Sequence, residues 1–183
     1  MNVQPQLIAL CIKHDRKAEY ELYRISYSYL LSICLRYSRD KDSAVEALNA
    51  GFLKILNNLS SYRPEVPYKA WIRRIMVNTL IDEYRKKKRE SENVTYVEEY
   101  YDNSDFSEVN EALSRIGCRQ IFEEVNKLPE ATRKVFNLYV IDGYSHKEIG
   151  QMLNVSEGTS KWHLNAARQK LKTFIENTIL TRV

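Results

Sequence analysis

Glycine and proline are scarce in this sequence, with 5 and 4 of its 183 residues respectively. Soluble proteins average roughly 7% glycine and roughly 5% proline. Because both residues mark turns and loops, their scarcity argues against a turn-dense all-β fold and against collagen-like or low-complexity chains. We therefore expect an all-α protein. Its length fits either one globular domain or two small ones of marginal stability.

Cysteine is also rare, and its three positions, Cys11, Cys34 and Cys118, are far apart and form no CxxC pair. This spacing excludes a disulfide framework and a zinc knuckle. Reduced thiols fit a cytoplasmic protein with Cys11 and Cys34 in its core, and a redox-sensing thiol is the alternative. No window approaches 18 apolar residues and no signal-peptide pattern opens the chain, so we expect no membrane insertion.

Catalytic and cofactor motifs are missing as well. The sequence has no P-loop and no G-x-G-x-x-G segment, and its histidines lack metal-ligand spacing with one another or with cysteine. Asp82 and Glu83 are neighbouring carboxylates, but adjacent residues of a helix do not face each other. We therefore expect no metal, no cofactor and no enzymatic activity.

Charge is nearly balanced overall, at a formal +4, but it is unevenly distributed. Residues 85–89 are five consecutive cations, and the segment from Glu90 to Glu111 then holds eight acids and no lysine or arginine. Such segregation predicts a basic binding surface beside an acidic connector.

Helical segments are predicted on both sides of a polar break in the first part of the chain. One opens at Pro5, a second is capped by Asp15 and covers Lys17–Tyr37, a third covers Ser43–Leu59 and a fourth covers Tyr68–Lys88. The third segment has an apolar face that should be buried: Ala44, Leu48, Gly51, Phe52, Ile55 and Leu59. Its opposite face carries Glu46, Asn49, Ala50 and Leu53. An exposed Leu53 fits a partner surface, and a single stray apolar residue is the alternative.

The fourth segment combines an apolar stripe (Ile72, Ile75, Met76, Thr79 and Leu80) with a second face of mixed chemistry. That second face holds Trp71, Arg74, Asn78, Asp82, Arg85 and Arg89. An aromatic plane, an amide and several cations are what binding of a single nucleic-acid strand requires. The alternative is a solvated basic face with Trp71 packed into the core.

The last part of the chain has the pattern of a helix-turn-helix. A helix over Cys118–Lys127 precedes one over Glu130–Ile141, which Gly143 ends. Ser145 and Glu148 then form a capping box, and after the turn Asn154-Val155 the last helix begins at its cap, Ser156. This helix has an inward stripe: Ser160, Leu164, Ala167 and Leu171.

The outward side of the last helix carries side chains suited to reading duplex DNA. Lys161 can donate to guanine, Asn165 can pair with adenine, and an exposed Trp162 can contact a thymine methyl. Thr159 lies on the flank, and Arg168 can neutralise a phosphate. A helical hairpin used for packing only is the alternative.

Three motifs in these segments resemble a known family. The extracytoplasmic-function (ECF) sigma factors of bacterial RNA polymerase contain segments similar to Ala44–Leu56 (AVEALNAGFLKIL), Trp71–Asp82 (WIRRIMVNTLID) and Leu128–Leu171. The segment FNLYVIDGYSHKEI resembles the branch of this family that is common in Bacteroidetes-type bacteria. The resemblance implies two small helical domains joined by an acidic linker. Residues 1–90 would bind core polymerase and the −10 element, residues 91–112 would be the linker, and residues 113–183 would bind the −35 element.

Carried over position by position, the resemblance implies three sets of site residues. Polymerase binding falls on Glu46, Asn49, Ala50 and Leu53. Capture of the melted −10 strand falls on Tyr62, Arg63, Trp71, Arg74, Asn78 and Arg85, within an element whose loop, Ser61–Pro67, would cup a flipped base. Recognition of the −35 duplex falls on Thr159, Lys161, Trp162, Asn165 and Arg168.

The sequence departs from the family at several of these positions. Asn49-Ala50 stands where the family usually has glutamine followed by an acid, which would weaken polymerase binding if that acid forms a charged pair. Ser160 replaces a usual β-branched apolar residue, and Trp162 replaces a usually small one.

The expected function is that of a subunit that directs RNA polymerase to promoters without a catalytic centre of its own. Its partners would be core polymerase, promoter duplex and the melted non-template strand. Members of the family commonly bind an anti-sigma factor, but this sequence does not identify such a partner. A stand-alone helix-turn-helix regulator is the alternative, and a protein that binds polymerase without starting transcription is a third possibility.

Overall fold

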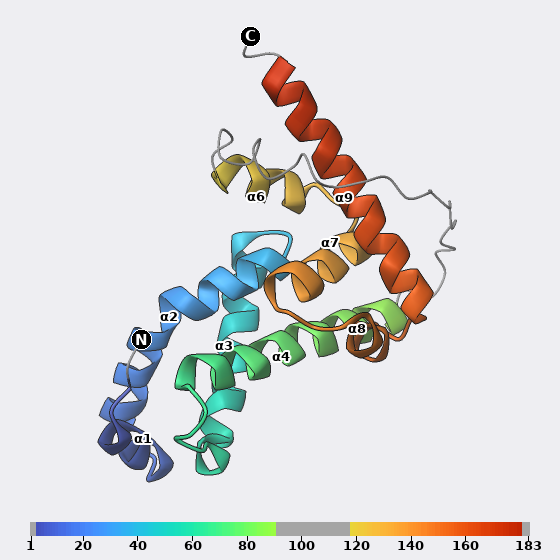
Figure 1. The fold of residues 1–183 in the computed structure, drawn as a ribbon. Coiled ribbons are helices and arrows are strands. Elements are labelled where there is room, and N and C mark those ends of the chain that lie inside the picture. The colour runs from blue at the N-terminus through green and yellow to red at the C-terminus, as the bar shows by residue number, and fades with distance from the viewer. Residues whose placement is uncertain (1–2, 91–117, 181–183) are drawn as a thin grey trace. The chain divides into compact units, whose positions relative to one another are not determined.

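The computed structural model describes residues 3–90 and 118–180. The chain forms two compact units, Met1–Glu92 and Asn93–Val183, and each is described by itself. Within the described ranges the secondary structure consists of helices joined by short turns, and no strand occurs (Figure 1). This confirms the expected all-α fold. The proposed linker, residues 91–112, lies outside the described residues.

The first unit is a cluster of packed helices, coloured blue to green in Figure 1. Its elements are α1 (Pro5–Ile12), α2 (Arg16–Tyr37), α3 (Lys41–Asn57), the 3-10 turn η1 (Leu59–Ser61) and α4 (Tyr68–Glu90). Helices α2, α3 and α4 all pack against one another, and α1 packs against α2 and η1.

Side-chain caps fix where two of these helices begin. Asp15 Oδ1 accepts a 2.9 Å hydrogen bond from the Ala18 amide, as its position before a helical stretch predicts. Asp40 does the same for α3, accepting from the Ser43 amide at 2.8 Å, so α3 begins two residues before the expected Ser43. This hydrogen bond is also the main reason that the pKa of Asp40 is lowered.

The core of the first unit contains the faces that the helical periodicity predicts. All six residues expected on the inner face of α3 are buried, although Leu59 reaches the core from η1 rather than from the helix itself. On α4 the expected stripe is buried except for Ile75, which is half-buried. Val77, Ile81 and Tyr84 are buried too, because α4 packs against both α2 and α3.

The second unit, yellow to red in Figure 1, is built around one long helix. Its described elements are α6 (Cys118–Asn126), α7 (Glu130–Phe136), the π turn η2 (Asn137–Ile141), α8 (His146–Leu153) and α9 (Glu157–Leu180). Helices α6, α7 and α8 each pack against α9. Its core contains the buried residues Val125, Leu128 and Ala167. The partly buried Ile121, Phe136 and Leu171 pack against them.

The helix caps and turns of the second unit lie where the helix-turn-helix pattern predicts them. The capping box of Ser145 and Glu148 is present, and Ser156 Oγ accepts from the Thr159 amide at 2.9 Å. Asn154 ends α8 in the left-handed region, with φ 55°, and Gly143 ends the preceding segment with φ 77°. The expected helix over 130–141 is α-helical only to Phe136 and then widens into η2.

No helix in residues 3–90 or 118–180 combines the length and the apolar character that a membrane crossing requires.

Candidate nucleic-acid interface

Three aromatic side chains form a cluster where the loop before α4 meets that helix. The Tyr62 ring centroid lies 5.6 Å from that of Tyr68 and 5.2 Å from that of Trp71, and Tyr68 and Trp71 are 6.0 Å apart. Tyr68 is buried, and burial raises its pKa to about 12. Trp71 is only half-buried, so it is not the core residue that the alternative interpretation of this face requires.

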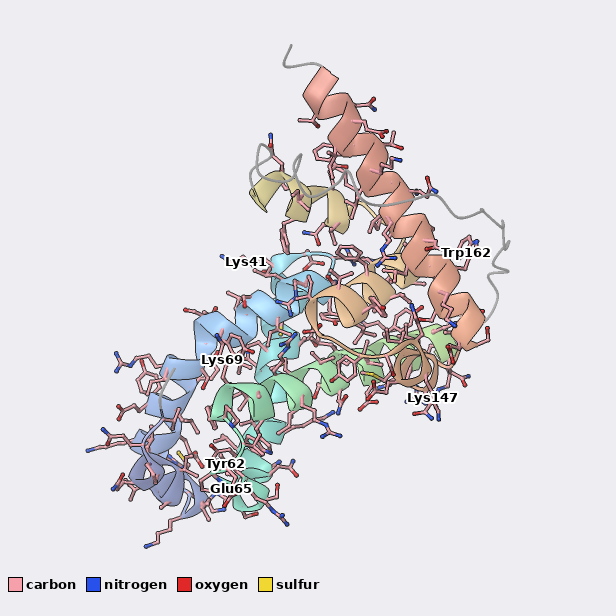
Figure 2. The ribbon with its side chains drawn as sticks, in the orientation of Figure 1. Lys41, Tyr62, Glu65, Lys69, Lys147 and Trp162 are labelled. Carbon is pink, nitrogen blue, oxygen red and sulfur yellow. The ribbon has the colours of Figure 1, made fainter. Side chains whose placement is uncertain are left out.

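The loop over residues 62–67 is folded onto this cluster. The Tyr62 hydroxyl donates a 2.9 Å hydrogen bond to the backbone oxygen of Val66, which closes the loop on itself. Figure 2 shows Tyr62 and Glu65 together at this loop and Lys69 at the start of α4. Arg63 is exposed in the same loop. The hydrogen bond from Tyr62 therefore restrains the loop, and the loop presents the exposed guanidinium of Arg63.

The outer face of α4 carries the polar side chains predicted from the sequence. Arg74 and Asn78 are exposed and Arg85 is half-buried. A guanidinium nitrogen of Arg85 lies 4.0 Å from Asp82 Oδ1. The face is thus basic and largely exposed, with the half-buried Trp71 at one end, which leaves an aromatic surface and cations accessible to a nucleic-acid strand.

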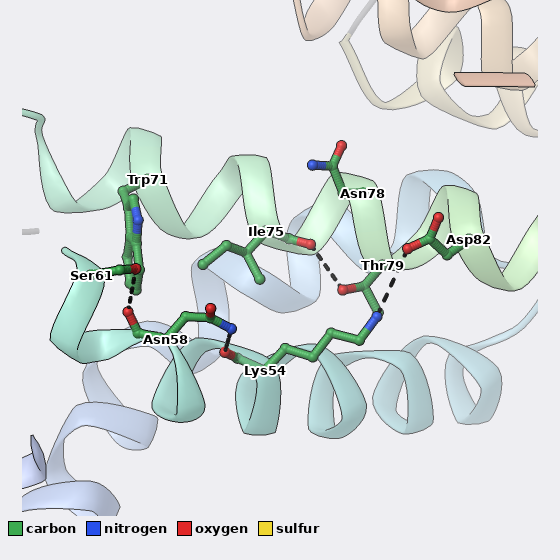
Figure 3. A pocket seen from close by; sticks show the side chains of 8 residues that line it. All are labelled: Lys54, Asn58, Ser61, Trp71, Ile75, Asn78, Thr79 and Asp82. Atoms are coloured by element: carbon green, nitrogen blue, oxygen red, sulfur yellow. Dashed lines mark hydrogen bonds and ion pairs between the residues drawn. The ribbon is translucent and has the colours of Figure 1, made fainter. Parts of the chain in front are cut away.

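A pocket of about 260 Å³ opens between α3, η1 and α4. Its lining includes Trp71 and Asn78, which were expected to capture the strand, together with Asp82 of the same predicted face and Ser61 of the predicted loop. The other four lining residues were not expected at this site: Lys54, Asn58, Ile75 and Thr79. Figure 3 shows the Trp71 ring hanging from α4 toward Ser61, and Lys54 stretched from α3 toward Asp82. Lys54 Nζ lies 4.0 Å from Asp82 Oδ2.

Several polar side chains that line the pocket form hydrogen bonds to the backbone of other lining residues. Ser61 Oγ donates to the Asn58 backbone oxygen at 2.7 Å, Asn58 Nδ2 donates to the Lys54 oxygen at 2.8 Å, and Thr79 Oγ1 donates to the Ile75 oxygen at 2.9 Å. The Asn78 amide makes no hydrogen bond within the described part of the chain. The pocket therefore offers an aromatic wall and an apolar side chain against which an unstacked base can pack, and the Asn78 amide points away from Lys54 and Asn58 in Figure 3.

The outer face of α3 is a separate surface of the first unit. Glu46, Asn49, Ala50 and Leu53 are all exposed, as expected, and 59% of Leu53 is accessible. Asn49 Oδ1 accepts a 2.8 Å hydrogen bond from the Tyr23 hydroxyl of α2, a contact that local sequence reasoning missed. The Tyr23 ring in turn packs edge-on against Phe52, with centroids 5.0 Å apart.

On α9 the expected base-reading residues differ in how accessible they are. Lys161 is exposed and is paired with Glu157, Nζ to Oε1 at 2.8 Å, whereas Thr159, Asn165 and Arg168 are half-buried. Trp162 projects from the helix (Figure 2), but it is half-buried rather than exposed as expected. Its ring packs against that of the neighbouring His163, with centroids 4.8 Å apart.

Two imidazole–hydroxyl contacts attach α9 to the rest of the second unit. His146 Nδ1 lies 2.9 Å from Ser160 Oγ, and His163 Nδ1 lies 3.0 Å from Thr132 Oγ1. Ser160 is fully buried, so the serine that stands at an apolar position of the family has a polar partner. Sequence reasoning noticed Ser160 but had no means of pairing it with His146.

No group of three or more potential metal-ligating side chains occurs in residues 3–90 or 118–180. Cys11 and Cys34 are buried, and burial raises their thiol pKa values to about 11 and about 12. Such thiols stay protonated at neutral pH and react slowly. The core interpretation of these two residues therefore fits better than the redox interpretation.

Comparison with known proteins assigns a family to both units. Residues 22–90 match the sigma-70 region 2 model, and residues 118–171 match the model of sigma-70 region 4. The RNA polymerase sigma factor SigZ of Bacillus subtilis is 32% identical over 137 residues, which cover 75% of each chain. The ECF RNA polymerase sigma factor SigW of the same organism is 26% identical over 169 residues, covering 87% of this chain and 90% of that one.

The same fold occurs in a solved structure. The sigma factor RpoE from Bartonella quintana, determined in complex with the anti-sigma factor NepR, matches with a TM-score of 0.50 and 18% identity over 86% of this chain and 96% of that one. At this level of identity the likeness concerns the fold alone.

The chain belongs to the sigma-70 family of RNA polymerase sigma factors, in its ECF group. It is accordingly a subunit that directs RNA polymerase to promoters for transcription initiation, and not a stand-alone helix-turn-helix regulator. The Bacteroidetes-like branch stays a prediction.

Proposed function

We propose that this sigma factor works through three surfaces: polymerase binding by the outer face of α3, capture of the melted −10 non-template strand by the loop and α4, and −35 duplex reading by α9. Residues 1–90 then act as sigma region 2, residues 91–112 as a linker and residues 113–183 as sigma region 4. The chain supplies binding energy and no catalytic group, and it works in the cytoplasm with polymerase.

The observation that carries the proposal is the pocket beside the aromatic cluster. Trp71 and Asn78 line it, and the exposed Arg74 lies between them on the same helix. Stacking of one base on an aromatic side chain contributes about 1–3 kcal/mol, and cations add salt-dependent affinity for phosphates. Opening of duplex DNA costs unpairing and unstacking energy, which these contacts can offset. We assign the pocket to a base that has left the duplex.

The polymerase-binding assignment is supported by exposure and shape. Leu53 is a large apolar side chain left in solvent on a helix whose other large apolar side chains are buried or half-buried. An exposed leucine beside the small Ala50 gives a partner helix room to pack closely. Because Ala50 carries no charge, we expect polymerase binding at this face to depend on packing more than on salt concentration.

An anti-sigma factor is a further proposed partner, by analogy with the Bartonella quintana complex. Such a partner would compete with polymerase for the first unit.

The proposal is tested by in vitro transcription. The purified chain is mixed with sigma-free core polymerase from its host and genomic DNA, and the RNA start sites are mapped. Starts downstream of a shared two-part motif support the proposal. Polymerase binding without defined starts would indicate a decoy, and site-specific DNA binding without polymerase binding would overturn the assignment of the α3 face.

The surfaces are then separated by variants. Arg74→Ala should reduce permanganate reactivity of thymines in the melted region, whereas Arg24→Ala, which removes the same charge from an exposed position of α2, should not. Leu53→Asp should abolish polymerase binding, whereas Leu10→Asp, at a 46% exposed leucine of α1, should leave it intact. Equal effects of the two members of a pair would contradict the corresponding assignment.

A further inference from the structure

His146 stands at the start of α8, and its ring contacts the elements on both sides. The ring lies nearly parallel to that of Tyr139 in η2, with centroids 4.4 Å apart and an interplanar angle of 20°. On the other side, Nδ1 lies 2.9 Å from Ser160 Oγ of α9. One imidazole therefore connects three consecutive elements of the helix-turn-helix unit.

The burial of Ser160 assigns the direction of this hydrogen bond. Ser160 is 0% exposed, and His146 is the partner seen for its hydroxyl among the described residues. A buried hydroxyl needs an acceptor for its hydrogen, and an unprotonated Nδ1 provides one. We therefore assign the donor role to Ser160 and place the proton of the neutral ring on Nε2. If Nδ1 were protonated, its N–H would face the serine hydroxyl, and the hydroxyl would lose the acceptor for its own hydrogen.

The contact lies where it can control DNA reading. Ser160 stands between Thr159 and Lys161, and the second contact, from His163 to Thr132 at 3.0 Å, holds the same turn of α9 against α7. Side chains that read a ligand need to be held within about 0.5 Å of their productive positions by the residues behind them. Loss of either contact would let this turn of α9 rotate.

We propose that His146 is a positioning residue for duplex recognition: its neutral imidazole, held between Tyr139 and Ser160, fixes the orientation of α9, so promoter binding weakens when the ring is protonated. The inference rests on the proposed role of α9 in reading the −35 duplex and adds a regulation of that site by pH.

The charged surroundings of the ring agree with a neutral imidazole. The titratable and charged groups around it are Tyr139 from η2 and Glu157, Lys161 and Arg168 from α9, and Lys147, the next residue of α8, acts on Glu157. Burial lowers the pKa of His146 below its ordinary value of 6.5, Lys161 and Arg168 lower it further, and Glu157 opposes them.

The sign of the effect follows from linkage. Because the folded pKa lies below 6.5, an unfolded or detached ring takes up a proton more readily than the positioned one. The stabilising contribution of the contact is fully present above the unfolded pKa. It is lost as the pH falls through 6.5 toward the folded pKa.

The experiment measures the affinity of holoenzyme for a fluorescent duplex of a promoter mapped as above, between about pH 7.5 and about pH 5.5. His146→Asn keeps an acceptor near the position of Nδ1 but cannot titrate. His14→Asn is the matched control, since His14 lies in the first unit with 85% of its side chain exposed. The profile of each variant is compared with that of the wild type, which removes the pH dependence of polymerase itself.

The wild type and His14→Asn should lose about 2- to 10-fold in affinity over this range relative to His146→Asn, which is the usual effect of losing one hydrogen bond such as that between Ser160 and His146. Ser160→Ala should bind more weakly at about pH 7.5 and show a flatter profile. Circular dichroism at each pH establishes that the variants are folded. If a variant does not fold, the ¹⁵N spectrum of the wild-type imidazole decides, because the proposal requires an unprotonated Nδ1 at neutral pH.

Three results would overturn the inference. The first is an identical pH profile of the wild type and His146→Asn. The second is tighter binding of the wild type at low pH, which would indicate an imidazolium–phosphate contact. The third is an Nδ1-protonated tautomer at neutral pH. Failure of the underlying function is recognised separately. If Lys161→Ala and Asn165→Ala leave promoter choice unchanged, the −35 role of α9 is wrong whatever the profile of His146.

Discussion

The phenol of Tyr23 on α2 donates a 2.8 Å hydrogen bond to Oδ1 of Asn49 on α3. This contact restrains the side chain of Asn49, an exposed residue on the face assigned to polymerase. Burial, followed by the neighbouring Tyr27, raises the pKa of Tyr23, so the phenol stays a donor throughout the neutral range. The interaction joins a residue of the expected interface to one that local periodicity did not select.

Tyr23→Phe removes the hydroxyl and leaves the ring packed on Phe52. We expect polymerase affinity to fall by about 2- to 10-fold, since a hydrogen bond of this kind contributes about 0.5–1.5 kcal/mol. A competition assay with labelled sigma factor measures it. Tyr20→Phe is the control, because that phenol is on the same helix and 69% exposed. An equal loss in both variants would show that the orientation of Asn49 is irrelevant.

The two tryptophans of the chain should affect different steps of initiation. Trp71→Ala removes the ring that packs on Tyr62 and lines the pocket, so binding of a non-template −10 oligonucleotide by holoenzyme should weaken by about 1–3 kcal/mol. Trp162→Ala should leave that binding unchanged and alter the preferred −35 sequence instead. Fluorescence anisotropy with single-stranded and duplex probes separates the two, and an exchange of the two phenotypes would refute the assignment of both surfaces.

The ion pair of Glu157 with Lys161 restrains a residue expected to contact DNA. Lys161 Nζ lies 2.8 Å from Glu157 Oε1, and the pKa of Glu157 is lowered by the hydrogen bond from Lys161. In Glu157→Gln the ammonium is released and an anion is removed beside the phosphates. Duplex affinity should rise by about 2- to 10-fold at low salt, with a steeper salt dependence.

Glu176→Gln is the matched control for Glu157→Gln. Glu176 also pairs with a lysine four residues away on α9, with Lys172 Nζ at 3.9 Å, but it lies beyond the base-reading turns. Its replacement should leave duplex affinity and salt dependence unchanged. A similar gain in both variants would mean that net charge, and not the release of Lys161, sets the affinity.

Helical periodicity was sufficient to predict which side of α3 is buried. The outer positions Glu46, Asn49, Ala50 and Leu53 are exposed because the spacing of the apolar residues fixes the inner face. The caps Asp15, Ser145 and Ser156 were equally predictable, since each acts on an amide three residues away. These are local relationships, and a local pattern contains them.

Contacts between helices were beyond the reach of the sequence. Lys54 and Asp82 line one pocket although 28 residues separate them in the numbering, and the pairing of His146 with Ser160 depends on how α8 crosses α9. The π turn η2 was missed because its residues have an ordinary helical pattern. Side-chain pairing of this kind follows from tertiary packing, which a single sequence does not specify residue by residue.

Gly150 should be irreplaceable in the helix-turn-helix because α8 comes close to the turn that follows it. A Cβ at Gly150 would lie 2.9 Å from the backbone oxygen of Val155, and the Val155 amide donates a 3.0 Å hydrogen bond back to the Gly150 oxygen. A backbone atom held in this way has little room to move. Gly150→Ala gains about 1 kcal/mol of helix propensity but incurs an overpacking cost of about 1–3 kcal/mol. We therefore expect the second unit to lose up to about 2 kcal/mol of stability in total.

Gly158 in α9 provides the opposite case within the same unit. The nearest atom to a Cβ at this exposed position is Ser156 Oγ, at an ordinary 3.6 Å, so Gly158→Ala should stabilise the unit by about 0.5–1 kcal/mol. Urea unfolding of the full chain, followed by Trp162 fluorescence in a Trp71→Phe background, measures both variants in the second unit alone. If Gly150→Ala were as stable as Gly158→Ala, the turn after α8 would be free to shift, and the close approach of Val155 would not be what requires a glycine here.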